Sequence, residues 1–144
     1  MPIKKPAELN HKVNELIKNR WSPRAFDGKP INKDVLKSLF EAARWAPSCN
    51  NSQPWRFIIA QKDNEDEYNK ALSCFNDRNQ RWVKNAPVIG FVCAYQYMGE
   101  DKKNRTYFYD TGMAMAQFTL QALEHDLYIH QAGGVLLDEV REKY

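Results

Sequence analysis

Apolar residues recur at helical spacing in several parts of the chain. Periods of three to four residues predict helices over residues 8–19, 65–75, 107–125 and 136–144. Another helix begins after Asn32, a residue type that caps helices, and ends before Pro47. The segment over residues 107–125 is rich in Ala, Met and Leu and carries few charges. We therefore expect it to be a long, buried, central helix.

Two runs have the length and composition of β-strands, residues 55–60 and residues 88–95. The second run is almost wholly apolar, which is typical of a strand covered on both faces. Helices and strands do not alternate regularly, and neither GxGxxG nor the P-loop pattern occurs. The sequence therefore predicts an α+β fold rather than a dinucleotide-binding or P-loop fold.

The length of 144 residues is that of one domain, spanning residues 1–144. The last predicted helix has no C-cap glycine, and no further strand follows it to complete a sheet. We therefore expect this domain to be incomplete at its C-terminus.

Composition and charge narrow the class of protein. The net charge of +3 is too small, and its basic residues too dispersed, to indicate nucleic-acid binding. The longest apolar run is far shorter than the ~20 residues that span a bilayer, and the first residues lack the apolar core of a signal peptide. Three cysteines show no metal-ligand spacing, which indicates reduced thiols and a cytoplasmic location.

Arg20, Ser22 and Arg24 form the first cluster with candidate chemistry. Two guanidinium groups and a hydroxyl within five residues, directly after a predicted helix, offer charge-assisted hydrogen bonds to a phosphate. A solvated basic turn is the alternative interpretation of the same residues.

The second cluster is the loop APSCNNSQPW at residues 46–55, in which prolines flank small and amide side chains. Its donors and acceptors suit a planar heterocycle with alternating carbonyl and N–H edges. The alternative is a loop whose amides satisfy only their own backbone. Cys49 could serve as a nucleophile, but no general base stands beside it in the sequence.

The third cluster is His130 followed by Gln131, Ala132 and the pair Gly133–Gly134. Consecutive glycines let the backbone approach a flat ligand closely and direct N–H groups at it. An ordinary tight turn, with His130 packed or at the surface, is the alternative interpretation of the same residues.

Taken in order, these clusters resemble the nitroreductase family of flavoproteins. RWSPRAF at residues 20–26 and APSCNNSQPW at residues 46–55 carry the resemblance most specifically. NQRWVKNAP at residues 79–87, Asp110-Thr111-Gly112 at the start of a long apolar helix, and AGG at residues 132–134 follow in the family's order.

The resemblance implies a nitroreductase-like fold, with a central, mostly antiparallel sheet flanked by helices, and a homodimer with FMN in the subunit interface. In that family pattern, Arg20, Ser22 and Arg24 hold the phosphate and the ribityl chain. The partner subunit's copy of the second loop meets the flavin ring, and Asn79 meets its pyrimidine side. The loop residues concerned are Pro47, Ser48, Asn51 and Gln53, and Gly133 and Gly134 present backbone groups near N5 and O4.

The implied activity is hydride transfer from NAD(P)H through flavin N5 to nitroaromatics, quinones or similar small-molecule acceptors. N5 carries this chemistry, so no catalytic side chain and no metal is expected. Two alternatives remain open at this stage. One is a non-catalytic flavin-binding or sensor protein, and the other is a domain that binds phosphorylated ligands through Arg20 and Arg24 without flavin.

Overall fold

The computed structural model describes residues 3–144, which form two compact units. Unit 1 comprises residues 3–22, 32–56 and 92–129, and unit 2 comprises residues 23–31, 57–91 and 130–144. Each unit is described by itself below, and the expected single domain over residues 1–144 stays a prediction. Both helices and strands are present, as the predicted α+β class requires.

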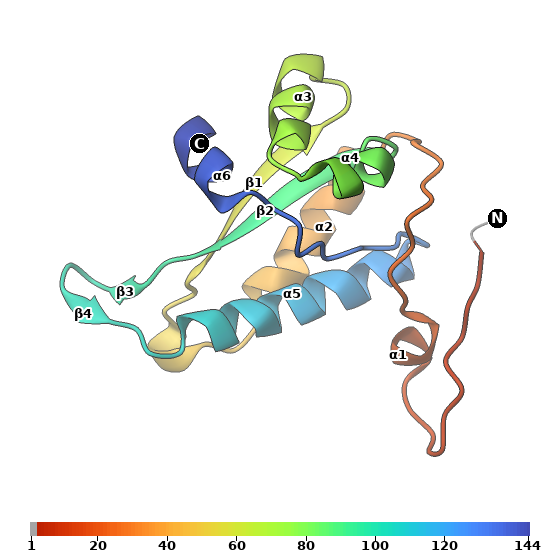
Figure 1. Ribbon diagram of the computed structural model, residues 1–144. Coiled ribbons are helices and arrows are strands. Elements are labelled where there is room, and N and C mark those ends of the chain that lie inside the picture. The colour runs from red at the N-terminus through yellow and green to blue at the C-terminus, as the bar shows by residue number, and fades with distance from the viewer. Residues whose placement is uncertain (1–2) are drawn as a thin grey trace. The chain divides into compact units, whose positions relative to one another are not determined.

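The elements follow one another along the chain in the order labelled in Figure 1. The helices are α1 (Glu15–Asn19), α2 (Lys33–Arg44), a 3-10 turn (Cys49–Asn51), α3 (Glu65–Ser73), α4 (Asp77–Val83), α5 (Tyr107–Glu124) and α6 (Leu137–Lys143). The strands are β1 (Trp55–Gln61), β2 (Val88–Ala94), β3 (Tyr97–Met98) and β4 (Lys102–Lys103).

Helices α2 and α5 lie side by side and form the core of unit 1 (Figure 1). The Asn32 side chain accepts a hydrogen bond from the Asp34 N–H at 2.7 Å, which confirms the predicted helix cap. Leu36, Leu39 and Ala43 are the buried residues of α2 and lie on one face of the helix, because they are spaced three and four residues apart. The rings of Phe40 and Phe118 meet edge to face, with centroids 5.2 Å apart.

Helix α1 is much shorter than the helix predicted over residues 8–19. It begins at Glu15, where the Asn14 side chain accepts the Leu16 N–H at 2.9 Å and caps the first turn. Leu9 and Val13, two of the apolar residues behind the prediction, are 44 % and 36 % exposed. The prediction of the first turns is wrong because these side chains have no core to face, and five residues of helix gain little on their own.

Strands β1 and β2 pair antiparallel, since backbone bonds join Lys62 to Pro87 at 3.0 Å and Tyr95 to Pro54 at 2.8 Å. Burial alternates along β2: Ile89 and Phe91 are buried, whereas Val92 is 41 % exposed. The expectation of a strand covered on both faces is therefore wrong within the described residues, where β1 is the only neighbour of β2.

The hairpin of β3 and β4 was not predicted from the sequence. Its strands have two residues each, with Tyr97 opposite Lys103 and Met98 opposite Lys102. Gly99 takes a φ of 67° at the turn, a conformation that glycine adopts without strain. Such short strands carry no detectable alternation of apolar residues, which is why the pattern gave no signal.

The core of unit 2 is built from α3, α4, α6 and the facing parts of β1 and β2. Its buried apolar cluster includes Tyr68, Cys74, Phe75 and Phe91. The Tyr68 hydroxyl lies 2.6 Å from the Ala86 carbonyl oxygen and 3.0 Å from that of Val83. Residues 134–136 pair with residues 74–76, since the Asn76 N–H donates to Gly134 and the Leu136 N–H donates to Cys74.

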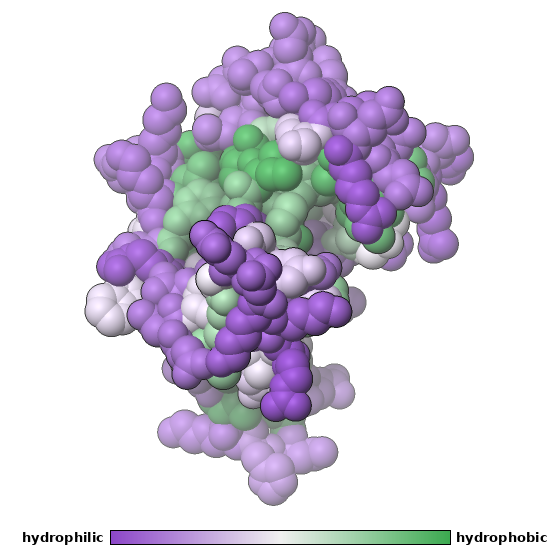
Figure 2. Space-filling model, turned by 90° about the vertical axis from the view of Figure 1, so that its left-hand side faces the viewer, coloured by the Kyte–Doolittle hydropathy of each residue, from purple (hydrophilic) through white to green (hydrophobic). Residues whose placement is uncertain are grey.

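Apolar side chains are also exposed, as the face drawn in Figure 2 shows. In unit 1, Trp45, Phe108 and Tyr109 are 70 %, 71 % and 71 % exposed. Large apolar side chains that are exposed as one contiguous patch are typical of surfaces that contact another molecule. None of the helices in residues 3–144 is long and apolar enough to cross a bilayer.

Candidate functional site

The ten predicted site residues divide between the two units. Unit 1 holds Arg20, Ser22, Pro47, Ser48, Asn51 and Gln53, and unit 2 holds Arg24, Asn79, Gly133 and Gly134. The two groups are therefore described separately, each with the contacts that its own unit provides.

Arg20 and Ser22 lie together in unit 1, directly after α1. The Arg20 Nη1 group donates to the Ser22 hydroxyl oxygen at 3.3 Å. Within residues 3–144, neither Arg20 nor Arg24 forms an ion pair with a carboxylate. The Trp21 Nε1–H between them is buried and has no hydrogen-bond partner among the same residues. The segment thus has more donors than acceptors, which suits an anionic ligand.

The loop over residues 47–53 is closed by its own hydrogen bonds. The Ser48 hydroxyl oxygen accepts the Gln53 N–H at 3.0 Å, and the Gln53 Nε2–H group donates to Asn51 Oδ1 at 3.0 Å. Pro54, the second flanking proline, is fully buried, whereas Pro47 is exposed. The loop is therefore fixed at its exit and internally braced, in agreement with a preorganised binding loop.

Three residues of this loop adopt left-handed backbone conformations. Asn50, Asn51 and Gln53 have φ values of 52°, 54° and 43°. Asparagine tolerates this region better than most residues, but glutamine gains no such advantage. Backbone conformations of this kind cluster at ligand-binding segments, so their presence supports a functional loop over a plain connector.

The internal amide contact leaves one donor and one acceptor free. Because Gln53 Nε2 and Asn51 Oδ1 bond to each other, Asn51 Nδ2 and Gln53 Oε1 have no hydrogen-bond partner among the described residues. A free N–H group beside a free carbonyl oxygen is complementary to a planar ring edge that presents a carbonyl beside an N–H. Each side-chain amide therefore uses one polar group to brace the loop and leaves the other group available to a ligand.

Two buried polar residues, which were not among the predicted site residues, form hydrogen bonds to this loop. Asp110, 4 % exposed, accepts the Cys49 N–H at 3.1 Å. Asn104, 2 % exposed, donates from Nδ2 to the Ser52 hydroxyl at 3.2 Å and accepts the Thr106 N–H at 3.0 Å. The spacing Asn-x-Thr before a long apolar helix is a turn signal that could have identified Asn104.

In unit 2, the structure brings Asn79 and Gly134 together. A Cβ atom at Gly134 would overlap the Asn79 amide and lie 2.7 Å from Asn76 Nδ2. The backbone at Gly134 cannot move away freely, because its carbonyl oxygen accepts the Asn76 N–H at 3.1 Å. A Cβ at Gly133 would meet nothing within 4 Å. Of the twin glycines, only Gly134 is therefore required by close approach.

His130 and Trp82 connect the predicted residues of unit 2. His130 Nδ1 lies 2.9 Å from the Pro23 carbonyl oxygen, which can only accept, so Nδ1 carries the proton. The His130 and Trp82 ring centroids are 4.3 Å apart, and Trp82 Nε1–H donates to Asn79 Oδ1 at 3.2 Å. This network links the residue before Arg24, the Asn79 amide and the glycine segment. We call these contacts the His130–Trp82 brace.

The brace shows which interpretation of His130 holds. The histidine is packed and structural, as one of the sequence alternatives proposed, and its neighbours are residues of the predicted site. Trp82 and His130 were not among the predicted site residues. A tryptophan three residues after a site asparagine was the available signal, since that spacing brings two side chains together on a helix.

Comparison with known proteins gives matches in sequence and in structure. A model of the nitroreductase family matches residues 17–82. The major NAD(P)H-flavin oxidoreductase of Aliivibrio fischeri is 34% identical over 96 residues, which are 65% of this chain and 44% of that protein. A nitrobenzene nitroreductase of Ectopseudomonas oleovorans is 39% identical over 47 residues, 33% of this chain and 21% of that protein. The matches thus span less than half the length of these curated relatives.

Two solved structures extend the comparison to the fold. One, described as an oxidoreductase containing FMN, has a TM-score of 0.92 and 38% identity, and the match covers 99% of this chain and 74% of that one. The other, a nitroreductase family protein of Clostridium difficile 630, has a TM-score of 0.73 and 27% identity, with coverage of 89% and 72%. On the family model, these relatives and the shared fold, the chain belongs to the nitroreductase family.

Proposed function

We propose that this chain is part of an FMN-dependent oxidoreductase that passes a hydride from NAD(P)H to nitroaromatic, quinone or similar acceptors. One observation carries the proposal more than any other. A structure described as an FMN-containing oxidoreductase matches 99% of this chain at 38% identity and a TM-score of 0.92. At that similarity, the residues around a shared ligand site are expected to correspond in type and position.

The residues present fit a phosphorylated planar ring system. Arg20, Ser22 and Arg24 would hold the phosphate and the ribityl chain, because both guanidiniums lack a carboxylate partner within residues 3–144. In the loop, Asn51 Nδ2 and Gln53 Oε1 are free to meet the edge of a heterocycle, and Pro47 and Ser48 would lie against its face.

Unit 2 supplies the remaining contacts in this proposal. Asn79, whose Oδ1 is held by Trp82, would donate from Nδ2 to the pyrimidine side of the ring. Gly134 permits the backbone to approach closely where any side chain would overlap Asn79. Gly133, which is free of such crowding, would contribute its backbone N–H group.

When bound, FMN supplies hydride acceptance and donation at N5. The protein's own residues bind the cofactor, orient its ring and stabilise the negative charge that reduction adds. Donors that are already in place do this without reorganisation, which is the main advantage of a fixed protein site over water. No acid, base or nucleophile among the side chains is needed for hydride transfer, so no catalytic residue is assigned.

The homodimer remains part of the proposal. It is supported by the exposed aromatic residues Trp45, Phe108 and Tyr109 in unit 1, whose burial against a second copy would stabilise an assembly. A cytoplasmic location is proposed on the three cysteines, which form no disulfide. No nucleic-acid or membrane partner is proposed.

The activity is tested by adding NADH or NADPH anaerobically to the purified chain supplied with FMN. We expect the visible flavin absorbance to bleach and to return when a quinone or nitroaromatic acceptor is added. If the chain binds flavin but NAD(P)H does not reduce it, or if no acceptor reoxidises it, the non-catalytic flavin-binding alternative is favoured.

A matched variant separates the flavin proposals from simple anion binding. Asn51→Ala with Gln53→Ala removes the free donor and acceptor but leaves both guanidiniums in place. We expect FMN binding to weaken in this variant while binding of inorganic phosphate is unchanged. Equal FMN affinity in both proteins would instead support a domain that recognises phosphorylated ligands without reading a ring.

A further inference from the structure

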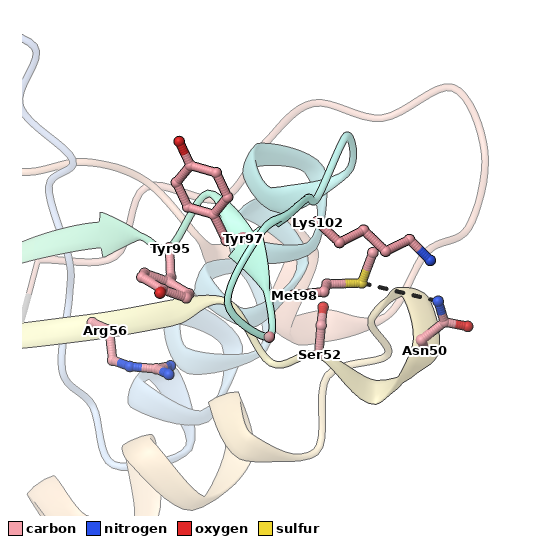
Figure 3. A pocket seen from close by; sticks show the side chains of 8 residues that line it. Asn50, Ser52, Arg56, Tyr95, Tyr97, Met98 and Lys102 are labelled. Atoms are coloured by element: carbon pink, nitrogen blue, oxygen red, sulfur yellow. Dashed lines mark hydrogen bonds between the residues drawn. The ribbon is translucent and has the colours of Figure 1, made fainter.

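A hollow of about 410 Å³ opens in unit 1 between the loop over residues 47–53 and the β3–β4 hairpin (Figure 3). This volume is within the ~300–1,000 Å³ that small-molecule sites usually occupy. Eight residues line it: Asn50, Ser52, Arg56, Tyr95, Tyr97, Met98, Gly99 and Lys102. They come from two segments that are far apart in the sequence.

The walls of the hollow are held by buried polar contacts. Asn104, which is almost completely buried, donates from Nδ2 to the Ser52 hydroxyl oxygen. Its Oδ1 accepts hydrogen bonds from the N–H and the hydroxyl of Thr106. The Asn104 N–H donates to the Gln96 carbonyl oxygen at 2.8 Å, which fixes the base of the hairpin. The Tyr95 N–H donates to the Pro54 carbonyl oxygen at 2.8 Å, and this bond joins the two segments that line the hollow. The hollow is therefore preformed rather than dependent on a ligand.

The lining carries two positive charges and no carboxylate. Arg56 uses Nη1 to donate to the carbonyl oxygens of Gln53 and Trp55, at 2.9 and 2.7 Å. Its Nη2 and Nε groups have no partner among the described residues, so the fork that binds a carboxylate in two places stays free. Glu100 and Asp101 follow in the hairpin turn but do not line the hollow.

The remaining lining is aromatic and thioether surface. The rings of Tyr95 and Tyr97 meet edge to face, with centroids 6.1 Å apart. Arg56 lies at one end of the hollow near Tyr95, and Lys102 lies at the other end with Asn50 (Figure 3). Met98 contacts Asn50, with Sδ 3.9 Å from Nδ2. Aromatic rings and a methionine sulfur together favour a flat aromatic ligand.

We propose that this hollow binds a small aromatic carboxylate. The carboxylate pairs with the free side of the Arg56 guanidinium, and the ring packs against Tyr95, Tyr97 and Met98. Lys102 adds a second cation that excludes positively charged aromatic compounds. The proposal concerns residues of unit 1 alone and does not depend on flavin binding or turnover.

The test measures binding of benzoate to the full chain by two-dimensional NMR, with benzamide and cyclohexanecarboxylate as probes that lack the charge or the aromatic ring. We expect benzoate to bind about tenfold more tightly than either compound. Amide signals of residues 95–102 are expected to shift. Arg56→Gln should weaken benzoate binding about tenfold, and Lys102→Met should weaken it less.

Lys33→Gln is the matched control, because Lys33 is an exposed cation at the N-terminal end of α2 and does not line the hollow. It should leave benzoate affinity unchanged. Because Arg56 also bonds to the backbone, a well-dispersed spectrum must show that Arg56→Gln folds, and the Lys102→Met result stands independently of it. Equal affinity for benzoate and benzamide, or an equal loss in Lys33→Gln, would overturn the proposal.

Discussion

Gly134 is the residue at which the structure tolerates a side chain least. A Cβ there would overlap the Asn79 amide, which Trp82 holds in place. We predict that Gly134→Ala lowers the free energy of unfolding by about 1–3 kcal/mol, the usual cost of overpacking, and weakens FMN binding. Denaturant unfolding measures the first effect and FMN fluorescence titration the second.

Gly133→Ala is the control for that substitution. Its new methyl group would meet nothing within 4 Å, so stability should change by less than about 0.5 kcal/mol. Similar decreases in the free energy of unfolding in Gly133→Ala and Gly134→Ala would show that close approach at Gly134 is not what forbids a side chain there.

His130 connects three predicted binding segments of unit 2 without contacting a ligand in this account. Removing it deletes the bond to the Pro23 carbonyl oxygen and the ring contact with Trp82. We predict that His130→Ala weakens FMN binding about tenfold, because Arg24 and Asn79 lose their fixed positions. A titration of FMN fluorescence measures this change.

The control for the His130–Trp82 brace is His11→Ala, at an exposed position in unit 1. It should bind FMN as the unaltered chain does. His130→Ala with unchanged FMN affinity, in a protein that remains folded, would show that the brace does not position the site.

At the scale of elements, helix α2 carries a charge cluster at its end. Hydrogen bonds from Arg44 and Trp45 lower the pKa of Glu41 from 4.5 to about 2. Because the folded-state pKa lies below the ordinary value, this stabilisation is fully present above pH 4.5 and is lost as the pH falls towards 2. NMR titration of the Glu41 carboxyl group should give a midpoint near the lower value.

Two substitutions check the cause of that shift. Arg44→Gln should return the Glu41 midpoint towards its ordinary range, since Arg44 is the largest contributor. Lys37→Gln should leave it unchanged, because Lys37 pairs with Asp34 instead. A midpoint at the ordinary value in the unaltered chain would show that the cluster does not persist in solution.

Elements with strong periodicity or clear caps were predictable, and elements without either were not. Helices α2, α3, α5 and α6 lie close to their predicted ranges, because an apolar stripe or a cap marks each. Helix α1 fell short because its apolar residues face solvent. Helix α4 was missed because only two of its residues, Trp82 and Val83, are apolar, and the β3–β4 hairpin was missed because its strands have two residues each.

At the scale of the whole molecule, the sequence motifs predict which residues bind the flavin, but they do not show which distant residues hold those side chains in place. Asn51 and Gln53 were predicted from their types, yet their mutual hydrogen bond decides which atoms remain free for a ligand. Asp110 and Asn104 brace the loop through hydrogen bonds to residues 61 and 52 positions away in the sequence, a relation that only folding creates. The His130–Trp82 brace is of the same kind.

We propose that Arg20, Arg24, the loop over residues 47–53, and Asn79 with Gly134 bind one FMN molecule. Equilibrium titration of FMN fluorescence with the purified chain tests it most directly. We expect saturable quenching, with an affinity at least about tenfold weaker in the double variant Arg20→Gln with Arg24→Gln, since these substitutions remove charge-assisted bonds to phosphate. Absence of quenching by the folded chain, or equal affinity in the double variant, would contradict it.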